Sequence, residues 1–508
     1  LLTINLFNVK KQLLSESLQV FLRKTFFRII AITVLTLLTT QSSFAQHWDI
    51  LGDESQVSAV ASSYTSIAVL NDVPYVVLRE GTGPVAKVKK RNPSTGVWEQ
   101  FGNDIGTNLT YSRILLDKTN QFYVTYVDAG NGNRLAVKKY SSETDTWEPL
   151  NNDVNNLYVS TGSVTNGVNQ LSSTPRSSLT FDSDNNPYIA FGDNGTLKPF
   201  VKKFDGASWV TVGAGSVNSA SIASGVSLVL DEADVPWLVF CGLGNTSSTT
   251  GTMTLYQFTG GAWTAVTTPS TIGGIRHTSM VLNSAGNLAI AFFDATGSVP
   301  GPSGGNRATI VEYNKSGATW SGLVRLGTRD SPNISLIKDV SGNLYCSFID
   351  KVDSSSYVQN GRVFMQVSGA TAWTEMKDPS VARGIDEPVD YLTIAAGSMY
   401  PFVVYTKTNS SSIVTPIVRT YAPAPPPAVL TTNAVSAITT TTADAGGNIT
   451  SDGGTAITER GIVYGTSPNP TTANTKVADV AAGTGTYTVT IPGLNPTTLY
   501  YIRAYAIN

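Results

Sequence analysis

Residues 185–209 read NNPYIAFGDNGTLKPFVKKFDGASW, and two parts of this stretch return in altered form elsewhere in the chain. The part PYIAFGD (187–193) returns as FYVTYVD at 122–128 and as PYVVLRE at 74–80. The part VKKFDGASW (201–209) returns as VKKYSSETDTW and VKKRNPSTGVW, both upstream. Such self-similarity at a steady interval is the sequence mark of a repeat architecture.

Tryptophan shows the length of the repeat. Seven of the eight tryptophans recur at intervals of 49 to 62 residues, and each interval holds the same order of short segments. An alternating apolar run ends near Asp or Asn, a turn follows, and then come an aromatic-rich run, a third run and the Trp segment. Period-two alternation between turn residues predicts strands. We expect the recurring tryptophans to pack equivalently between neighbouring repeats; they are Trp48, Trp98, Trp147, Trp209, Trp263, Trp320 and Trp373.

Four strands in about fifty residues are typical of a β-propeller. The last repeat, 388–421, lacks a Trp strand, and HWDILG at 47–52 is a Trp strand with no partners before it. The sequence therefore predicts an all-β chain with a seven-bladed propeller over 46–421. We expect it to be closed by pairing of the N-terminal strand with a strand near Val414–Tyr421, which would leave no open sheet edge. An open array or an eight-fold ring is the alternative.

The pattern resembles the propellers of the sialidase-like and Kelch-like groups. The resemblance lies in the repeat and not in a complete signature. Gly317 to Trp320 match the second half of a sialidase Asp-box, but Tyr313 and Lys315 stand where that motif has Ser and Asp. No Kelch double glycine recurs at a fixed place. The resemblance therefore implies the fold and no particular activity.

A second domain follows a proline-rich linker at 422–429, which should be stiff and extended. Residues 430–508 are rich in Thr, Ala and Gly, and they carry the spacing Leu494-x-Pro496-x-Thr498-x-Tyr500. This spacing resembles the tyrosine corner of fibronectin type III domains. The resemblance implies a β-sandwich, here truncated inside its sixth strand, in which the Tyr500 hydroxyl folds back onto backbone a few residues upstream.

The N-terminus reads as a secretory signal. Arg23, Lys24 and Arg28 precede the apolar run 29–38, and SSFAQ follows at 42–46. We expect residues 1–45 to be a signal region with an upstream extension, cleaved after Ala45, so that no membrane span remains and the protein is secreted or lies on the cell surface. An uncleaved anchor is the alternative.

Composition narrows the class of partner. A net charge of −2 and only 14% charged residues argue against binding of nucleic acid, because a protein that binds nucleic acid usually has a basic face.

Cys241 and Cys346 are too few for a disulfide framework, so we expect buried free thiols. With only two histidines, a histidine-rich zinc site is excluded, and we predict neither a metal nor a cofactor. Residues 182–186 (DSDNN) resemble a calcium loop without its glycine and are better interpreted as a turn.

Loop lengths differ between the two ends of the predicted ring. Turns between first and second strands are short in every repeat, whereas the long connections at 150–175, 242–252, 294–307 and 350–361 all fall at the opposite end. Elaborated loops on a rigid scaffold are where binding sites are built. Neutral drift of a tolerant surface is the alternative.

Polar residues recur at this elaborated end. Acids stand five residues after the aromatic position of the second strand, and basic residues stand near the starts of first strands. Together they could bind a sugar or an acidic group, or hold a cation; alternatively, each acid caps a loop or pairs with a neighbour. Arg113 and Arg176 share strand parity, but Arg276 does not. The candidates are Glu80, Asp128, Asp193, Asp294 and Asp350, with Arg113, Arg176, Arg276 and His277.

These features favour a non-catalytic recognition or adhesion protein whose propeller binds a glycan or an extracellular protein. The alternative is a carbohydrate-active enzyme, a sialidase-like glycosidase or a lyase that uses the loop carboxylates. A glycosidase would need two carboxylates roughly 5–9.5 Å apart.

Overall fold

The computed structural model describes residues 47–51, 57–81, 85–165, 177–217, 222–244, 250–294, 307–327, 333–351, 359–377, 385–408, 413–422, 428–452 and 457–507. The predicted signal region, Arg176 and most of the predicted linker lie outside these residues. The chain divides into two compact units, one spanning 46–422 and the other including 423–508. The described residues form antiparallel strands and three short 3-10 helices, with no α-helix among them.

The larger unit contains seven runs of four antiparallel strands, which we number as repeats 1 to 7. The first strands are β2 (Ser62–Leu70), β7 (Leu109–Leu116), β12 (Ser177–Phe181), β16 (Ile222–Leu230), β20 (Ile275–Leu282), β25 (Ser335–Lys338) and β30 (Asp390–Ala396). The second strands are β3 (Val73–Glu80), β8 (Phe122–Asp128), β13 (Pro187–Asp193), β17 (Pro236–Leu243), β21 (Leu288–Asp294), β26 (Leu344–Lys351) and β31 (Pro401–Thr408).

The outer strands complete each repeat. The third strands are β4 (Val85–Arg91), β9 (Arg134–Ser141), β14 (Pro199–Phe204), β18 (Thr252–Thr259), β22 (Arg307–Asn314), β27 (Gln359–Gln366) and β32 (Val414–Ala422). The fourth strands are β5 (Trp98–Gln100), β10 (Thr146–Pro149), β15 (Trp209–Thr211), β19 (Ala262–Val266), β23 (Thr319–Trp320), β28 (Thr374–Glu375) and, for repeat 7, β1 (His47–Ile50).

The connections between repeats hold further short elements that the sequence did not reveal. Three of them, β6 (Gly106–Thr107), β24 (Val324–Arg325) and β29 (Ile385–Pro388), pair with the third strand beside the fourth. After η1 (Ala129–Asn131), η2 (Leu150–Asn152) and η3 (Val154–Asn156), β11 (Tyr158–Thr165) pairs with both β9 and β13. It thereby joins repeats 2 and 3 into one nine-stranded sheet, so part of the expected loop at 150–175 is a strand.

The N-terminal strand pairs with the end of the larger unit. Trp48 lies opposite Tyr421 and Ile50 opposite Arg419 in an antiparallel ladder between β1 and β32, as the sequence predicted. Arg419 Nη1 also donates a hydrogen bond to the Trp48 carbonyl at 2.7 Å. Strands about 370 residues apart in the chain therefore complete one sheet.

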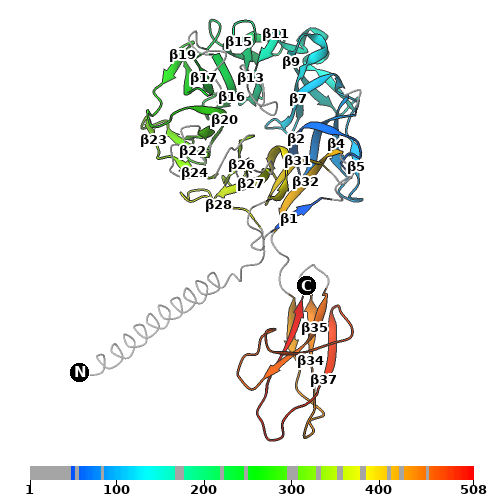
Figure 1. Ribbon diagram of the computed structural model, residues 1–508. Helices are drawn as coiled ribbons and strands as arrows, with labels where there is room; N and C mark the ends of the chain where they lie inside the picture. The colour runs from blue at the N-terminus through cyan, green and yellow to red at the C-terminus, as the bar shows by residue number, and fades with distance from the viewer. Residues whose placement is uncertain are drawn as a thin grey trace, which may run out of the picture. The chain divides into compact units, whose positions relative to one another are not determined.

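The repeats lie around a common centre with their first strands innermost (Figure 1). β2 contacts both β7 and β30, so repeat 1 touches repeats 2 and 7. Residues from the first strands of all seven repeats line one central cavity of about 520 Å³. Serine hydroxyls join neighbouring inner strands there: Ser227 Oγ accepts from the Met280 amide at 2.9 Å, and Ser178 Oγ accepts from the Leu228 amide at 3.0 Å.

The tryptophans join neighbouring repeats through one recurring contact. The indole N–H of Trp147 donates to the Phe101 carbonyl, and that of Trp263 donates to the Val212 carbonyl, in each case just beyond the last strand of the preceding repeat. The tryptophans are not equally buried, however. Trp147 is 2% exposed, whereas Trp209 and Trp263 are only half-buried.

The smaller unit contains two three-stranded sheets around an apolar core. One sheet has the order β33 (Val429–Thr432), β34 (Ala443–Ser451), β37 (Gly485–Ile491), and the other β36 (Thr475–Ala478), β35 (Glu459–Gly465), β38 (Tyr501–Ile507). The Asn495 amide donates to the Tyr500 hydroxyl at 3.2 Å. The expected contact of this hydroxyl with upstream backbone is therefore present, with the hydroxyl as acceptor.

Candidate functional site

The two ends of the larger unit follow from strand pairing. Ser62, at the start of a first strand, lies opposite Glu80, at the end of the second strand, and Ile275 lies opposite Asp294 in the same way. The starts of first strands therefore share one end with the second-to-third-strand loops. The short turns between first and second strands lie at the other end.

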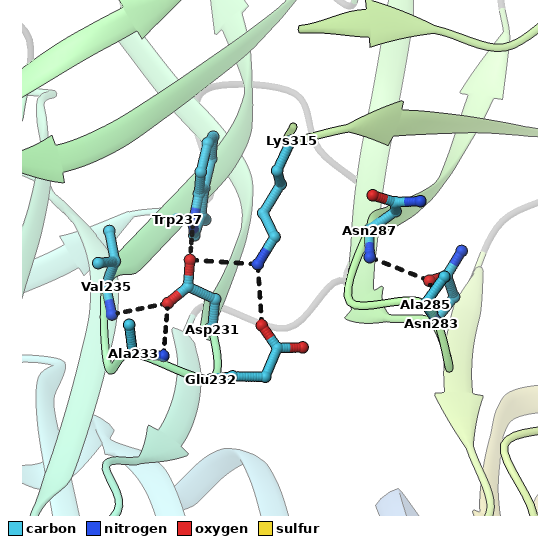
Figure 2. A network of polar contacts seen from close by, with 9 residues as sticks. All are labelled: Asp231, Glu232, Ala233, Val235, Trp237, Asn283, Ala285, Asn287 and Lys315. Carbon is cyan, nitrogen blue, oxygen red and sulfur yellow. Dashed lines mark hydrogen bonds and ion pairs between the residues drawn. The ribbon is translucent and has the colours of Figure 1, made fainter. Parts of the chain in front are cut away.

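At the short-turn end, the side chain of the first residue of each of several turns accepts hydrogen bonds from amides of the same turn. Asp231 Oδ1 accepts from the Ala233 and Val235 amides, and Asn283 Oδ1 accepts from the equivalent amides of its own turn (Figure 2). Residues 182–186 are built alike, with Asp182 Oδ1 accepting from the Asp184 and Asn186 amides. This confirms that the segment is a capped turn.

One charged network at this end is saturated in the same way. Asp231 Oδ2 accepts from the Trp237 indole at 3.0 Å and pairs with Lys315 at 3.2 Å, and Lys315 also pairs with Glu232 at 3.0 Å (Figure 2). Burial alone would raise the pKa of the Asp231 carboxyl, but these hydrogen bonds outweigh burial and lower it. The network joins repeats 4 and 5 through Lys315, which pairs with both carboxylates.

The five acids at the elaborated end are held mainly by neighbours on their own repeat. None of them is among the residues that line the central cavity or its mouth, the hollow at the starts of the first strands of repeats 1, 2, 6 and 7. Each is fixed as a loop cap or in an ion pair. Their partners include Lys89 Nζ for Glu80 (2.6 Å), Tyr158 Oη for Asp128 (2.7 Å), Thr196 Oγ1 for Asp193 (2.8 Å), Arg325 Nη2 for Asp294 (3.3 Å) and Arg362 Nη1 for Asp350 (2.8 Å).

The described basic candidates lie in different surroundings and do not form one site. Arg113 lines both the mouth and the central cavity, whereas Arg276 lines neither, as the difference in strand parity suggested. His277 is 4% exposed, and its burial, together with the charge of Arg276, lowers the pKa of its imidazole to about 4. His277 is therefore a neutral buried side chain at neutral pH.

A recurring bulge shapes the mouth of the central cavity. Each described first strand except those of repeats 3 and 6 shifts register against its second strand near its start. A residue of this segment adopts a left-handed backbone: Tyr64 (φ 54°), Tyr111 (φ 54°), Gly225 (φ 57°), His277 (φ 45°) and Tyr391 (φ 54°). Asn333 (φ 59°) has the corresponding place in repeat 6. Left-handed backbone is rare for tyrosine, and bulges re-aim side chains.

Three of these residues form an aromatic cluster. The ring centroid of Tyr64 lies 5.0 Å from that of Tyr111 and 5.5 Å from that of Tyr391. All three tyrosines are half-buried and line the mouth together with Arg113 and Asn333. Repeats 7, 1 and 2 thus present an aromatic surface over the central cavity. Backbone strain concentrated at one place is a common feature of functional sites.

Polar atoms around the mouth are left unsatisfied by the fold. Ser112 Oγ, Asn333 Oδ1 and Thr393 Oγ1 are buried and have no hydrogen-bond partner among the described residues. All three belong to residues that line the mouth. Buried polar atoms are usually paired, so unpaired ones gathered at one concave place mark a candidate ligand site.

Sequence reasoning identified Arg113 but missed the three tyrosines and Asn333. Each of them directly precedes a short run such as Thr65-Ser66-Ile67 in the first strand. Aligning the repeats at that run would have revealed a column of large or polar residues in every repeat except repeat 4, which has Gly225 there. Of the predicted loops at 150–175, 242–252, 294–307 and 350–361, the parts 166–175, 245–249, 295–306 and 352–358 lie outside the described residues, as does Arg176. No group of three or more metal-ligating side chains occurs in the described part of the chain.

Comparisons with known proteins do not assign the chain to a family. No family model matches the chain, and no curated protein matches it. Among solved structures, a polysaccharide lyase of family PL25, an ulvan lyase, is 13% identical with a TM-score of 0.45, over 73% of this chain and 95% of that chain. A protein of unknown function from Dyadobacter fermentans is 10% identical with a TM-score of 0.43, over 75% and 99%.

A fungal alcohol oxidase of the AA5 family in complex with copper is 13% identical with a TM-score of 0.47, over 91% of this chain and 97% of that chain. These likenesses are too weak to carry an argument about activity. None of the described helices is long and apolar enough to cross a membrane.

Proposed function

We propose that residues 46–422 are a seven-bladed β-propeller, closed by its N-terminal strand, that binds carbohydrate at the mouth of its central cavity. Three observations support the architecture: seven four-stranded runs, the pairing of β1 with β32, and the contact of β2 with both β7 and β30. Secretion, with the smaller unit as a fibronectin-type spacer, completes the proposal and rests on the sequence alone.

The observation that carries the function is the tyrosine cluster of Tyr64, Tyr111 and Tyr391. An aromatic face is electron-rich and offers a flat apolar surface, which suits the C–H face of a sugar ring. The surrounding hydroxyl, amide and guanidinium groups can bind sugar hydroxyls. A concave, partly aromatic surface with a few convergent polar groups is how small-ligand sites are usually built.

Substitution by asparagine tests this proposal with little risk to the fold. Asn tolerates the left-handed backbone of Tyr64 and already has the corresponding place at Asn333. We expect the full chain to bind oligosaccharides on a glycan array, and Tyr64→Asn and Tyr111→Asn each to weaken binding about tenfold, since losing about 1.4 kcal/mol of apolar contact lowers an affinity tenfold. Tyr501→Asn, in the smaller unit, is the matched control and should bind as the wild type does. Unchanged binding by both mouth variants would refute the site.

A carbohydrate-active enzyme is the second candidate. The observation that favours it is the presence of tyrosine hydroxyls and a guanidinium in one cavity, since tyrosine can act as a general acid or base. The version that uses loop carboxylates is weaker, because each of those acids is held by a neighbour. Incubating the chain with an oligosaccharide that it binds, and measuring new reducing ends, separates the two: cleavage that Tyr111→Asn abolishes would establish an enzyme.

A further inference from the structure

Arg113 stands at the junction of the mouth and the central cavity. It lies on β7, two residues after Tyr111, and lines both hollows. Burial in this position lowers the pKa of its guanidinium to about 10, which still leaves the group charged at neutral pH. A full positive charge is therefore held inside the ring of first strands.

No described carboxylate balances this charge. Arg113 and Lys338 are the only charged residues among those that line the two hollows, and both are cations. Arg79 adds to them, with its guanidinium carbon 5.7 Å from the ring centroid of Tyr64. Lys338 is exposed at the end of β25, beside the short turn and away from the mouth, so Arg113 and Arg79 supply the positive charge near the mouth.

Arg113 is half-buried, and the fold treats the two fully buried arginines among the described residues differently. Arg362, 9% exposed, pairs with Asp350 and Glu375 at 2.8 Å each. Arg460, 8% exposed, pairs with Asp479 at 2.7 Å. Desolvating a cation is costly unless an anion compensates it. Arg113 lacks that compensation within the described residues, which a bound anion would supply.

We propose that the mouth selects carbohydrates that carry an anionic group, a carboxylate or a sulfate ester, and that Arg113 binds this group while the tyrosines hold the sugar ring. The proposal rests on the carbohydrate site proposed above. A guanidinium presents donors in a fixed fork that matches the oxygens of either anion, so Arg113 would set both the charge and the orientation of the ligand.

The test compares oligosaccharides of like length on the full chain at about 0.15 M salt. Fluorescein-labelled oligogalacturonate carries carboxylates, carrageenan oligosaccharide carries sulfate esters, and galacto-oligosaccharide is neutral. We expect one or both anionic probes to bind at least about tenfold more tightly than the neutral probe, as for a charge-assisted contact. Which anionic probe binds more tightly distinguishes carboxylate from sulfate.

Four proteins decide the role of Arg113. Arg113→Gln should remove the preference for anionic probes, weakening their binding at least about tenfold more than that of the neutral probe, and Arg113→Lys should keep part of the preference. Lys118→Gln, an equal charge change in the exposed turn at the other end of the same hairpin, should behave as the wild type. Since Arg113 has no acidic partner to lose among the described residues, Arg113→Gln should melt at or above the wild-type temperature, which shows that it is folded.

Two failures are distinguishable. If Arg113→Gln binds anionic probes as tightly as the wild type while Tyr64→Asn weakens binding, the anionic selectivity is wrong and the carbohydrate site stands. The site itself is wrong if Tyr64→Asn changes no probe, or if no probe binds the wild type, and the inference then falls with it.

Discussion

The substitution Trp48→Ala tests whether the N-terminal strand β1 is an integral part of the larger unit. The Trp48 side chain is 6% exposed, its indole N–H donates to the Met376 carbonyl at 2.9 Å, and its ring centroid lies 5.1 Å from that of Tyr421. Trp48→Ala therefore removes a buried aromatic side chain from between repeats 6 and 7. Such truncations cost about 3–5 kcal/mol, and we expect a loss of this size in the free energy of unfolding.

Trp209→Ala is the matched control. Its indole N–H makes the equivalent bond to the Asn156 carbonyl at 3.1 Å, but the side chain is only half-buried. Because less apolar surface returns to water, we expect a smaller cost of about 1–2 kcal/mol.

Urea unfolding of the full chain, followed by far-UV circular dichroism, compares the two variants through the transition of the larger unit. A cost for Trp48→Ala no greater than that for Trp209→Ala would refute the account of the N-terminal strand. Deleting residues 46–51 should be still more destabilising, because it leaves the edge of β32 unpaired.

Two further outcomes follow from the structure. Asp231→Ala should lower the free energy of unfolding by about 2–3 kcal/mol, since it leaves the Val235 amide and the Trp237 indole without their acceptor and Lys315 with Glu232 alone. Asp231→Asn keeps the backbone cap, as Asn283 does, and should cost about 1 kcal/mol in the same urea assay. The pKa of His277 is depressed in the folded state to about 4, so the unfolded chain binds the additional proton as pH falls below about 6.5, and stability declines from there to about 4. His277→Asn should remove about 3 kcal/mol of this acid sensitivity, and equal pH profiles of stability for the two proteins would contradict it.

The strand order could be predicted from sequence because short-range signals repeat. Trp209 and its counterparts mark the outermost strand, and Asp182 and its counterparts mark the turn after the first strand. Because both signals recur, a few repeats are enough to predict the strand order of the others. Pairing of β1 with β32 followed from one surplus strand at the start and one missing strand at the end. The short strands of the connections, such as β11, could not be predicted, because their pairing depends on neighbouring repeats.

The candidate site was harder to predict, and for a physical reason. Tyr64 reads as an ordinary member of an alternating strand, and nothing local signals that a bulge will turn its backbone left-handed. The acids of the second-strand ends stood out because they recur at one repeat position. In the structure, however, Asp350 belongs to an ion pair and Asp128 caps a loop. Arg113 was predicted because it stands near the start of a first strand, but the absence of an acidic neighbour among the described residues appears only in three dimensions.

Hydrogen exchange of the full chain with and without a bound oligosaccharide tests the central claim most directly. If the mouth is the binding site, the ligand should slow exchange in peptides that cover 62–67, 109–114 and 390–394, where the tyrosines lie. The turns at 117–121, 182–186 and 231–235, at the opposite end of the larger unit, should exchange as before. Protection confined to those turns, with none at the starts of the first strands, would contradict the account.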